Sequence, residues 1–205
     1  MALLIGRKIG MTQLFEDSGK VTPVSVIEAG PCPIIQVKTR DKEGYAAIQI
    51  GFDEVKDHRA TQPMKGHCKK ADVGPQRIMR EIRVDDDSAY TVGDTVDVKV
   101  FEGVNKVHIT GMTKGRGFAG TVKRHGFKIG RKTHGSHSHR EPGAVGQCAT
   151  PARIFKGKKL PGRMGGVKRT ARNLTVVQID PENNLLFIKG SVPGANNGIV
   201  FIKTA

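Results

Sequence analysis

Short runs in which apolar and polar residues alternate fill most of the chain before residue 111 and return after residue 172. A period of two is typical of β-strands that bury one face, and Val, Ile and Thr are frequent in these runs. Turn-forming clusters such as PENN and PGANNG separate the later ones. The pattern predicts strands over 20–29, 33–39, 45–52, 80–84, 95–101, 106–110, 173–180, 184–190 and 198–204.

Helix signals are weak by comparison. Only QPMKGHCKKAD (62–72) and its neighbourhood indicate a helix. Many short strands with little helix between them favour an antiparallel barrel or sandwich over a parallel sheet. We therefore expect a mainly β fold.

Residues 111–172 differ in kind from the rest of the chain. They hold thirteen glycines and few large apolar residues, and no amphipathic period runs through them. Such a segment cannot bury enough surface to offset the entropy lost when it becomes ordered. We expect residues 1–110 and 173–205 to form a β-rich globular domain, and residues 111–172 to be a long extended insertion between two of its strands.

Charge separates the same two parts. The formal net charge is +15, and residues 111–172 contain sixteen Lys and Arg but one acid, Glu141. The rest of the chain contains eighteen residues of each sign, so the whole net charge lies in the insertion. This predicts a polyanionic partner, either nucleic acid or an anionic membrane face. Frequent Gly and Pro argue against a basic membrane-binding helix.

Targeting and redox signals are sparse. No uncharged apolar run reaches about 18 residues, and Arg7 and Lys8 come too early for the core of a signal peptide. Three cysteines, Cys32, Cys68 and Cys148, lie far apart. An odd number without a C-x-x-C pair favours free thiols in a reducing compartment, although one disulfide stays open. We expect a cytoplasmic protein with no membrane partner.

Gly115, Gly117 and Gly120 have the G-x-G-x-x-G spacing of a dinucleotide-binding loop. That site needs a strand before the glycines, a helix after them, and an acid about 20 residues further on for the ribose. We expect no helix after Gly120, and no Asp occurs in 111–172. A nucleotide-dependent enzyme is therefore the weaker alternative. Glycines also let a basic backbone pass close to folded RNA.

His134, His137 and His139 lie close together in the sequence, with Cys148 nearby as a possible fourth metal ligand. The alternative, which we favour, is that these imidazoles stack on bases or bond to phosphates within the basic stretch. Cys148 as a nucleophile lacks any sign of a buried, oriented base. We expect no metal, no cofactor and no catalytic residue.

The densest basic run is IFKGKKLPGRMGGVKRTAR (154–172). A charge run is usually a solvated face, but this one has almost no acids to pair with, which favours binding to a phosphate backbone. A free nucleic-acid chaperone or a DNA-binding protein would share these features and stays an alternative.

Several motifs occur in a characteristic order. They are GRKIGMTQLF (6–15), FEGVNKVHITGMTKGRGFAGTVKRHGF (101–127), THGSHSHREPGAVGQ (133–147) and TPARIFKGKKLPGRMG (150–165). Together with PGANNG (193–198), they make the chain similar, essentially from end to end, to the bacterial ribosomal protein L3 (uL3) family of the large subunit.

The resemblance implies a six-stranded, translation-factor-like barrel with an internal extension that enters large-subunit (23S-type) rRNA and reaches toward the peptidyl transferase centre. It also implies early assembly near the 3′ end of that rRNA, with ribosomal proteins L14 and L19 as neighbours. We accordingly expect a non-enzymatic ribosomal protein that has no small-molecule substrate and is not a homo-oligomer.

Residue by residue, four cations (114, 116, 123 and 124) fall on the family's glycine-rich basic core, and His134, His139 and Arg140 fall on its "THG…SHR" stretch. From the resemblance and the charge pattern, the residues expected to contact rRNA are Lys8, Lys114, Arg116, Gly117, Lys123, Arg124, Lys128, Arg131, Lys132, His134, His137, His139, Arg140, Arg153, Lys156, Lys158, Lys159, Arg163, Lys168, Arg169 and Arg172.

The tip of the extension is expected at Gln147, Cys148 and Ala149, near the peptidyl transferase centre. Gln147 matches the glutamine of the family's "GQ". The chain departs from the family at His108, where Asp or Asn is usual. It also departs at Ala149, where some bacterial members carry a methylated glutamine, so that modification is impossible here.

Overall fold

The computed structural model describes residues 3–16, 18–85 and 89–205 of the chain. The chain forms two compact units. We call Met1–Met112 with Lys168–Ala205 the barrel unit, and Thr113–Val167 the basic unit.

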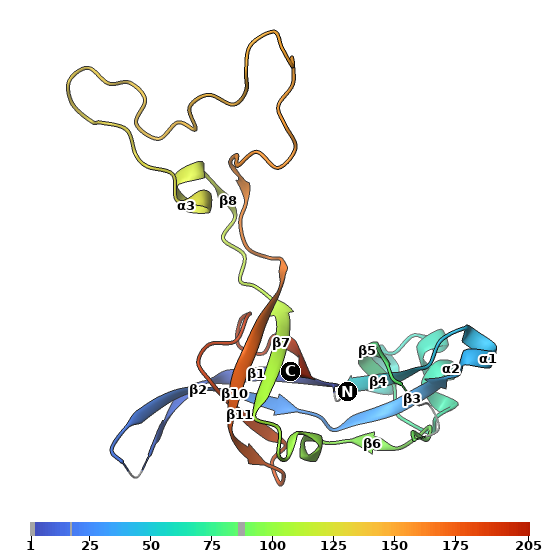
Figure 1. Ribbon diagram of the computed structural model, residues 1–205. Helices are drawn as coiled ribbons and strands as arrows, with labels where there is room; N and C mark the ends of the chain where they lie inside the picture. The colour runs from blue at the N-terminus through green and yellow to red at the C-terminus, as the bar shows by residue number, and fades with distance from the viewer. Residues whose placement is uncertain (1–2, 17, 86–88) are drawn as a thin grey trace. The chain divides into compact units, whose positions relative to one another are not determined.

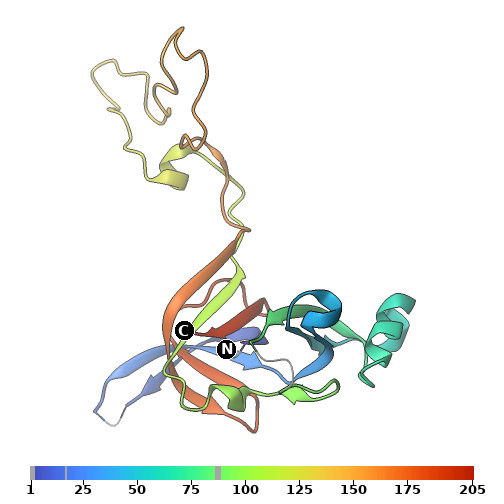
Figure 2. The same cartoon turned by 45° about the vertical axis from the view of Figure 1, so that its right-hand side comes forward.

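Six antiparallel strands close into a barrel in the order β1-β12-β7-β10-β11-β2 (Figures 1 and 2). The mainly β fold and the six-stranded barrel predicted above are thereby confirmed. The strands are β1 (Leu3–Phe15), β2 (Val21–Ala29), β7 (Lys106–Met112), β10 (Lys168–Asp180), β11 (Leu185–Lys189) and β12 (Ile199–Thr204).

The barrel interior is filled by one side of each strand. In β7, Val107 and Ile109 are fully buried while their neighbours are more exposed, and Leu186 and Ile188 repeat the pattern in β11. Successive strand residues point to opposite faces, so alternation in sequence becomes a buried face and an outer face. This alternation is the reason why the sequence pattern predicts strands in these two segments.

Strand β1 is the barrel strand that the sequence pattern did not predict. It pairs with β12 from Leu3 to Arg7 and with β2 as far as Phe15, with a register shift between Lys8 and Gly10. Two glycines and two basic residues interrupt its alternation, and the register shift changes which face the following residues occupy. The pairing thus depends on partners far away in the chain.

A second sheet with the order β5-β4-β3-β6 packs beside the barrel. Its strands are β3 (Cys32–Lys38), β4 (Ala47–Glu54), β5 (Gln76–Arg83) and β6 (Thr95–Val96). The strand predicted over 95–101 is wrong beyond Val96, because Val98–Phe101 form a 3₁₀ helix, η2. Side chains three residues apart line up in such a helix, which buries both Val98 and Phe101.

Short helices complete the barrel unit. They are α1 (Arg40–Glu43), the 3₁₀ turn η1 (Asp57–Arg59) and α2 (Gln62–Lys69). The predicted helix near 62–72 is confirmed. Cys68 of α2 is fully buried and packs with Ile35 and Ala71, which fixes the helix against the second sheet.

The basic unit contains little regular structure. Strands β8 (Phe118–Ala119) and β9 (Gly162–Arg163) pair as a short antiparallel ribbon, and α3 (Thr121–His125) lies beside β8 (Figure 1). The remaining residues form turns and irregular loops.

The insertion expected over 111–172 extends past the basic unit at both ends. Gly111 and Met112 lie in β7, and residues 168–172 lie in β10. Backbone pairing explains the difference, because Met112 pairs with Lys168 and Gly111 with Arg169 in the barrel wall. The boundaries of the basic charge segment, at residues 111 and 172, therefore do not coincide with those of the basic unit, at residues 113 and 167.

Candidate nucleic-acid interface

The basic unit presents its cations to solvent. It contains thirteen Lys and Arg with one acid, Glu141, and every one of these side chains is exposed. Only Ala119 and Thr121 are buried within residues 113–167, all of which are described. No ion pair found in the described part of the chain involves this unit. Its positive charge is therefore not neutralised by the protein itself.

Close backbone contacts form the stem of the unit. Thr113 N–H donates to the Val167 carbonyl, Arg116 N–H to the Met164 carbonyl, and Met164 N–H to the Gly117 carbonyl, each at 2.9–3.0 Å. Gly165 has φ +70° and lies against the Lys114 carbonyl, where a Cβ would collide. Glycine is needed at Gly165 for both reasons.

A helix follows Gly120, which corrects the expectation that none would. It is the five-residue α3, whose last turn is closed by Gly126 in the left-handed conformation. The sequence lacks an apolar stripe there because α3 packs mostly through polar groups. Arg124 Nη1 donates to the Leu160 carbonyl at 2.8 Å, and a His125 ring nitrogen lies 3.0 Å from the same oxygen.

This local geometry does not make a dinucleotide loop. The strand before α3 is two residues long and pairs antiparallel with β9 instead of entering a parallel sheet. Gly115 and Gly120 face open space and neither has a positive φ, whereas Gly117 has φ +69°. The G-x-G-x-x-G spacing thus lacks the parallel strand and the longer helix of a dinucleotide-binding βαβ unit.

The predicted histidines occupy a small loop closed by backbone. Gly130 N–H donates to the His139 carbonyl at 2.9 Å, and His139 Nδ1 lies 2.8 Å from the Arg131 carbonyl. His134 has φ +56°, and both His134 and His137 are exposed. Among the described residues there is no group of three or more His, Cys, Asp or Glu able to hold a metal ion.

The predicted tip is exposed along its whole length. Gln147 and Cys148 line a shallow hollow of about 390 Å³ with Arg153 and Ile154. Ala149 lies beside it and is also exposed. These side chains are free to meet a partner, and none of them is part of a core.

Three of the predicted RNA contacts lie on β10 of the barrel unit instead of in the basic unit. Lys168, Arg169 and Arg172 belong to β10 and are exposed. Near them, His108 accepts the Asn173 backbone N–H on its Nδ1 at 3.0 Å. The histidine that departs from the family pattern thus has a structural contact with β10.

Lys8 occupies a different environment from the other predicted contacts. Its side chain is only 7% exposed, and its Nζ donates to the Val192 carbonyl at 3.0 Å. Its backbone N–H and carbonyl bond to Gly198 and Asn197. The ammonium group therefore ties β1 to the loop before β12.

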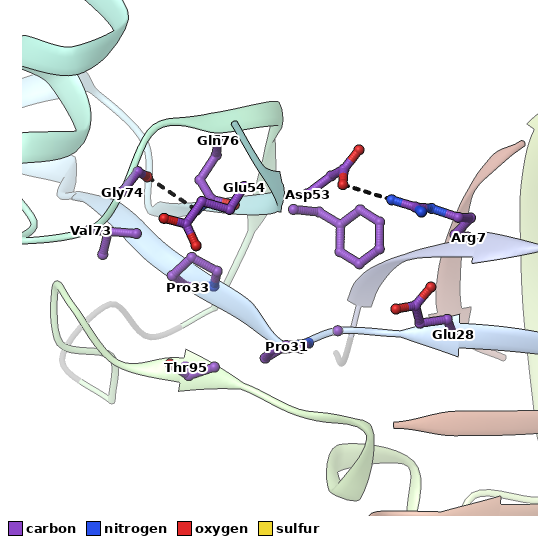
Figure 3. A pocket seen from close by; sticks show the side chains of 12 residues that line it. Arg7, Glu28, Pro31, Pro33, Asp53, Glu54, Val73, Gly74, Gln76 and Thr95 are labelled. Carbon is purple, nitrogen blue, oxygen red and sulfur yellow. Dashed lines mark hydrogen bonds and ion pairs between the residues drawn. The ribbon is translucent and has the colours of Figure 1, made fainter. Parts of the chain in front are cut away.

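A hollow of about 360 Å³ lies in the barrel unit between β1, β2, β3 and β4 (Figure 3). Its charged groups are partly engaged with one another. Arg7 Nη2 donates to Asp53 at 2.7 Å, and the other Asp53 oxygen accepts from Arg77 at 3.1 Å. Gln76 donates to the Gly74 carbonyl at 3.1 Å. The hollow has an ion-pair network that joins the barrel to the second sheet.

All three cysteines are free thiols, with Cys32 and Cys68 buried and Cys148 exposed. Burial raises the pKa of Cys32 to about 12. In the described ranges, no helix has the length and apolar character needed to cross a membrane.

Comparison with known proteins identifies a family to which the chain is similar. The family profile described as ribosomal protein L3 matches residues 72–184, more than half of the chain. Curated proteins named large ribosomal subunit protein uL3 are similar over nearly the full length. The protein of Syntrophus aciditrophicus is 51% identical over 201 residues, which cover 98% of this chain and 92% of that protein.

Two further relatives carry the same name. The Carboxydothermus hydrogenoformans protein is 52% identical over 202 residues, covering 98% of this chain and 96% of that protein. The Thermotoga maritima protein is 53% identical over 205 residues, which cover 100% of this chain and 98% of that protein. The chain therefore belongs to the ribosomal protein uL3 family and is a structural constituent of the large ribosomal subunit, not an enzyme.

Proposed function

We propose that the basic unit, residues 113–167, is the main contact of this chain with large-subunit rRNA. The observation that carries the proposal is a set of thirteen exposed cations in a unit with a single acid, Glu141, and only two buried residues. Neutralising phosphates where RNA segments converge removes their mutual repulsion, and it releases condensed counterions. The exposed Lys168, Arg169 and Arg172 would extend this contact along β10.

The scaffold of the unit fits that role. Backbone hydrogen bonds hold the two segments of its stem together, and Gly165 lets them approach closely, so the stem is narrow enough to enter a crevice in folded RNA. Because the unit buries almost nothing, its loops gain their final order from the partner. Arg124 links α3, which also carries Lys123, to the Leu160 carbonyl.

As a ribosomal protein, the chain has its place in the ribosome in the cytoplasm, with rRNA and other ribosomal proteins as partners. The family resemblance supports three finer proposals. The chain joins the subunit early, near the 3′ end of the rRNA. Ribosomal proteins L14 and L19 are its neighbours, and the tip at Gln147, Cys148 and Ala149 approaches the peptidyl transferase centre.

Salt dependence of binding tests the phosphate contacts. If about ten cations of the chain meet phosphates, the slope of log affinity against log salt for full-length chain on large-subunit rRNA is roughly −7 to −9. A slope shallower than about −3 would contradict the proposal.

Single cations refine the test. Lys123→Gln should reduce the magnitude of the slope by about 0.7 to 0.9, because one phosphate contact is lost. Lys42→Gln, at an exposed lysine of α1 in the barrel unit, is the matched control and should leave the slope unchanged. Equal effects of both variants would mean that the charge acts without regard to location.

A further inference from the structure

The β8–β9 ribbon has two different faces. On one face, Ala119 is 3% exposed. Its cross-strand partner Gly162 lies so close to the Arg124 guanidinium of α3 that a Cβ there would be 2.7 Å from Nη1. This face is therefore covered by α3.

The opposite face carries Phe118 and Arg163. These residues face each other across the ribbon, and residues next to each other in a strand point to opposite sides. Phe118 is 80% exposed, the largest fraction among the exposed large apolar residues of the described chain. The ribbon thus displays a largely exposed aromatic ring on the same face as an arginine side chain.

The ring face of Phe118 is open. Phe155, in the same unit, has the Arg153 guanidinium 5.3 Å from its ring centroid. No such cation lies over Phe118 in the described part of the chain. Phe118 and Arg163 are a directly opposite pair, and the Cβ atoms of such pairs are about 4.5–5.5 Å apart, so the two side chains leave the same face of the ribbon as neighbours.

The surroundings of the ring select the chemistry of its partner. Lys114 and Arg116 precede Phe118 and are exposed, and Arg163 lies across from it. A flat apolar protein surface covering Phe118 would also have to desolvate these cations without pairing them, which is unfavourable. An unpaired nucleotide offers a flat ring for stacking and a phosphate for the cations.

We propose that Phe118 stacks on an unpaired base of the rRNA while Arg163 contacts the phosphate next to it. This inference rests on the proposed rRNA contact of the basic unit, and it adds a base-binding position to a surface otherwise described by charge. Stacking neutralises no phosphate, so its effect on affinity is separable from the salt slope.

The test compares full-length variants on in vitro transcribed large-subunit rRNA across a range of salt concentrations. Phe118→Leu removes the aromatic ring at an exposed position and should weaken binding roughly 5- to 100-fold at every salt concentration, with an unchanged slope. Phe118→Tyr keeps the ring and should bind like the wild type. Arg163→Gln should instead reduce the magnitude of the slope by about 0.7 to 0.9.

Phe15→Leu is the matched control. Phe15 is 76% exposed on β1 in the barrel unit, so it tests the loss of an exposed phenylalanine elsewhere. It should bind naked rRNA like the wild type. Ultraviolet cross-linking should attach the segment containing Phe118 to a nucleotide in the wild type and in Phe118→Tyr, but not in Phe118→Leu.

Several results would overturn the proposal. One is an rRNA affinity of Phe118→Leu equal to that of Phe15→Leu. Another is a change in the salt slope of Phe118→Leu as large as that of Arg163→Gln. Normal binding of Phe118→Leu to naked rRNA with loss from assembled subunits would show that a protein covers the ring. A shallow slope for the wild type, with Phe118→Leu still weakened, would contradict the phosphate proposal and leave the stacking in place.

Discussion

Met112 and Lys168 face each other as the last residue pair of the ladder between β7 and β10. The two strands that leave the barrel are thus already in the geometry of an antiparallel hairpin. Antiparallel strands can be joined by as few as two residues. The barrel therefore has no geometric need for the residues between them.

Replacing residues 113–167 with Asn-Gly should leave the barrel folded. Closing a loop costs about 0.6 kcal/mol for each doubling of its length, so the shortened chain should be at least as stable as the full chain. Its salt-dependent affinity for large-subunit rRNA should fall by several orders of magnitude. Thermal unfolding followed by circular dichroism, together with filter binding, checks both expectations. Full rRNA affinity in the shortened chain would contradict the proposed function.

Gly165→Ala should disrupt the stem of the basic unit. The substitution places a Cβ against the Lys114 carbonyl and forces a positive φ on a residue with a side chain. Hydrogen exchange should accelerate at the Arg116 and Met164 amides, and rRNA affinity should fall. Gly115→Ala is the control, because that position faces open space without a positive φ. Equal protection in both variants would refute the assigned role of Gly165.

Thiol labelling should distinguish the three cysteines. Cys148 is exposed, whereas Cys68 is buried and the Cys32 thiol donates to the Ile5 carbonyl. Burial raises the pKa of Cys32 to about 12, so almost no thiolate is present at pH 8. A maleimide should add once to the native chain and three times after denaturation, as measured by intact mass. Rapid double or triple labelling of the native chain would count against the buried positions.

Glu81→Gln should cause a small loss of stability that depends on pH. Lys38 Nζ donates to Glu81 at 2.6 Å, which holds the pKa of Glu81 below its ordinary value, with a weaker contribution from Tyr45. A carboxylate with a lowered folded pKa stabilises the fold above its unfolded pKa, about 4.3, and loses that contribution as the pH falls through the folded value.

Urea unfolding at several pH values checks this expectation. The free energy of unfolding of the wild type should exceed that of Glu81→Gln at pH 7, and this difference should shrink in high salt and vanish in acid. A difference that grows as the pH falls would mean that Lys38 does not stabilise the Glu81 carboxylate.

Local alternation was enough to predict most strands, but not which of them close the barrel. Val107 and Ile109 show the period of β7 by themselves. The pairing of Leu3 with Lys203 joins residues almost a full chain apart, and no local pattern contains it. For the same reason the sequence could not separate the barrel strands from the second sheet.

The sequence predicted which segment forms the candidate site, but not the environment of each residue in it. Charge and glycine content identified the exposed basic unit, because a segment without apolar periodicity cannot become a core. They could not separate Lys8, which bonds to carbonyls inside the barrel unit, from cations that face solvent. Phe118, for which we propose base stacking, was not among the predicted residues. The sequence shows it only as an aromatic residue among cations, and the structure was needed to show that its side chain is exposed.

Strand β12 lies between β1 and β7, yet it follows both of them and the basic unit in the chain. During vectorial synthesis, residues 113–167 consequently leave the translating ribosome before the barrel can close. Until residues 199–204 emerge, β1 and β7 each keep an unpaired edge, and open strand edges are prone to pair with other chains. The nascent protein thus exposes its most basic segment before its own fold is complete.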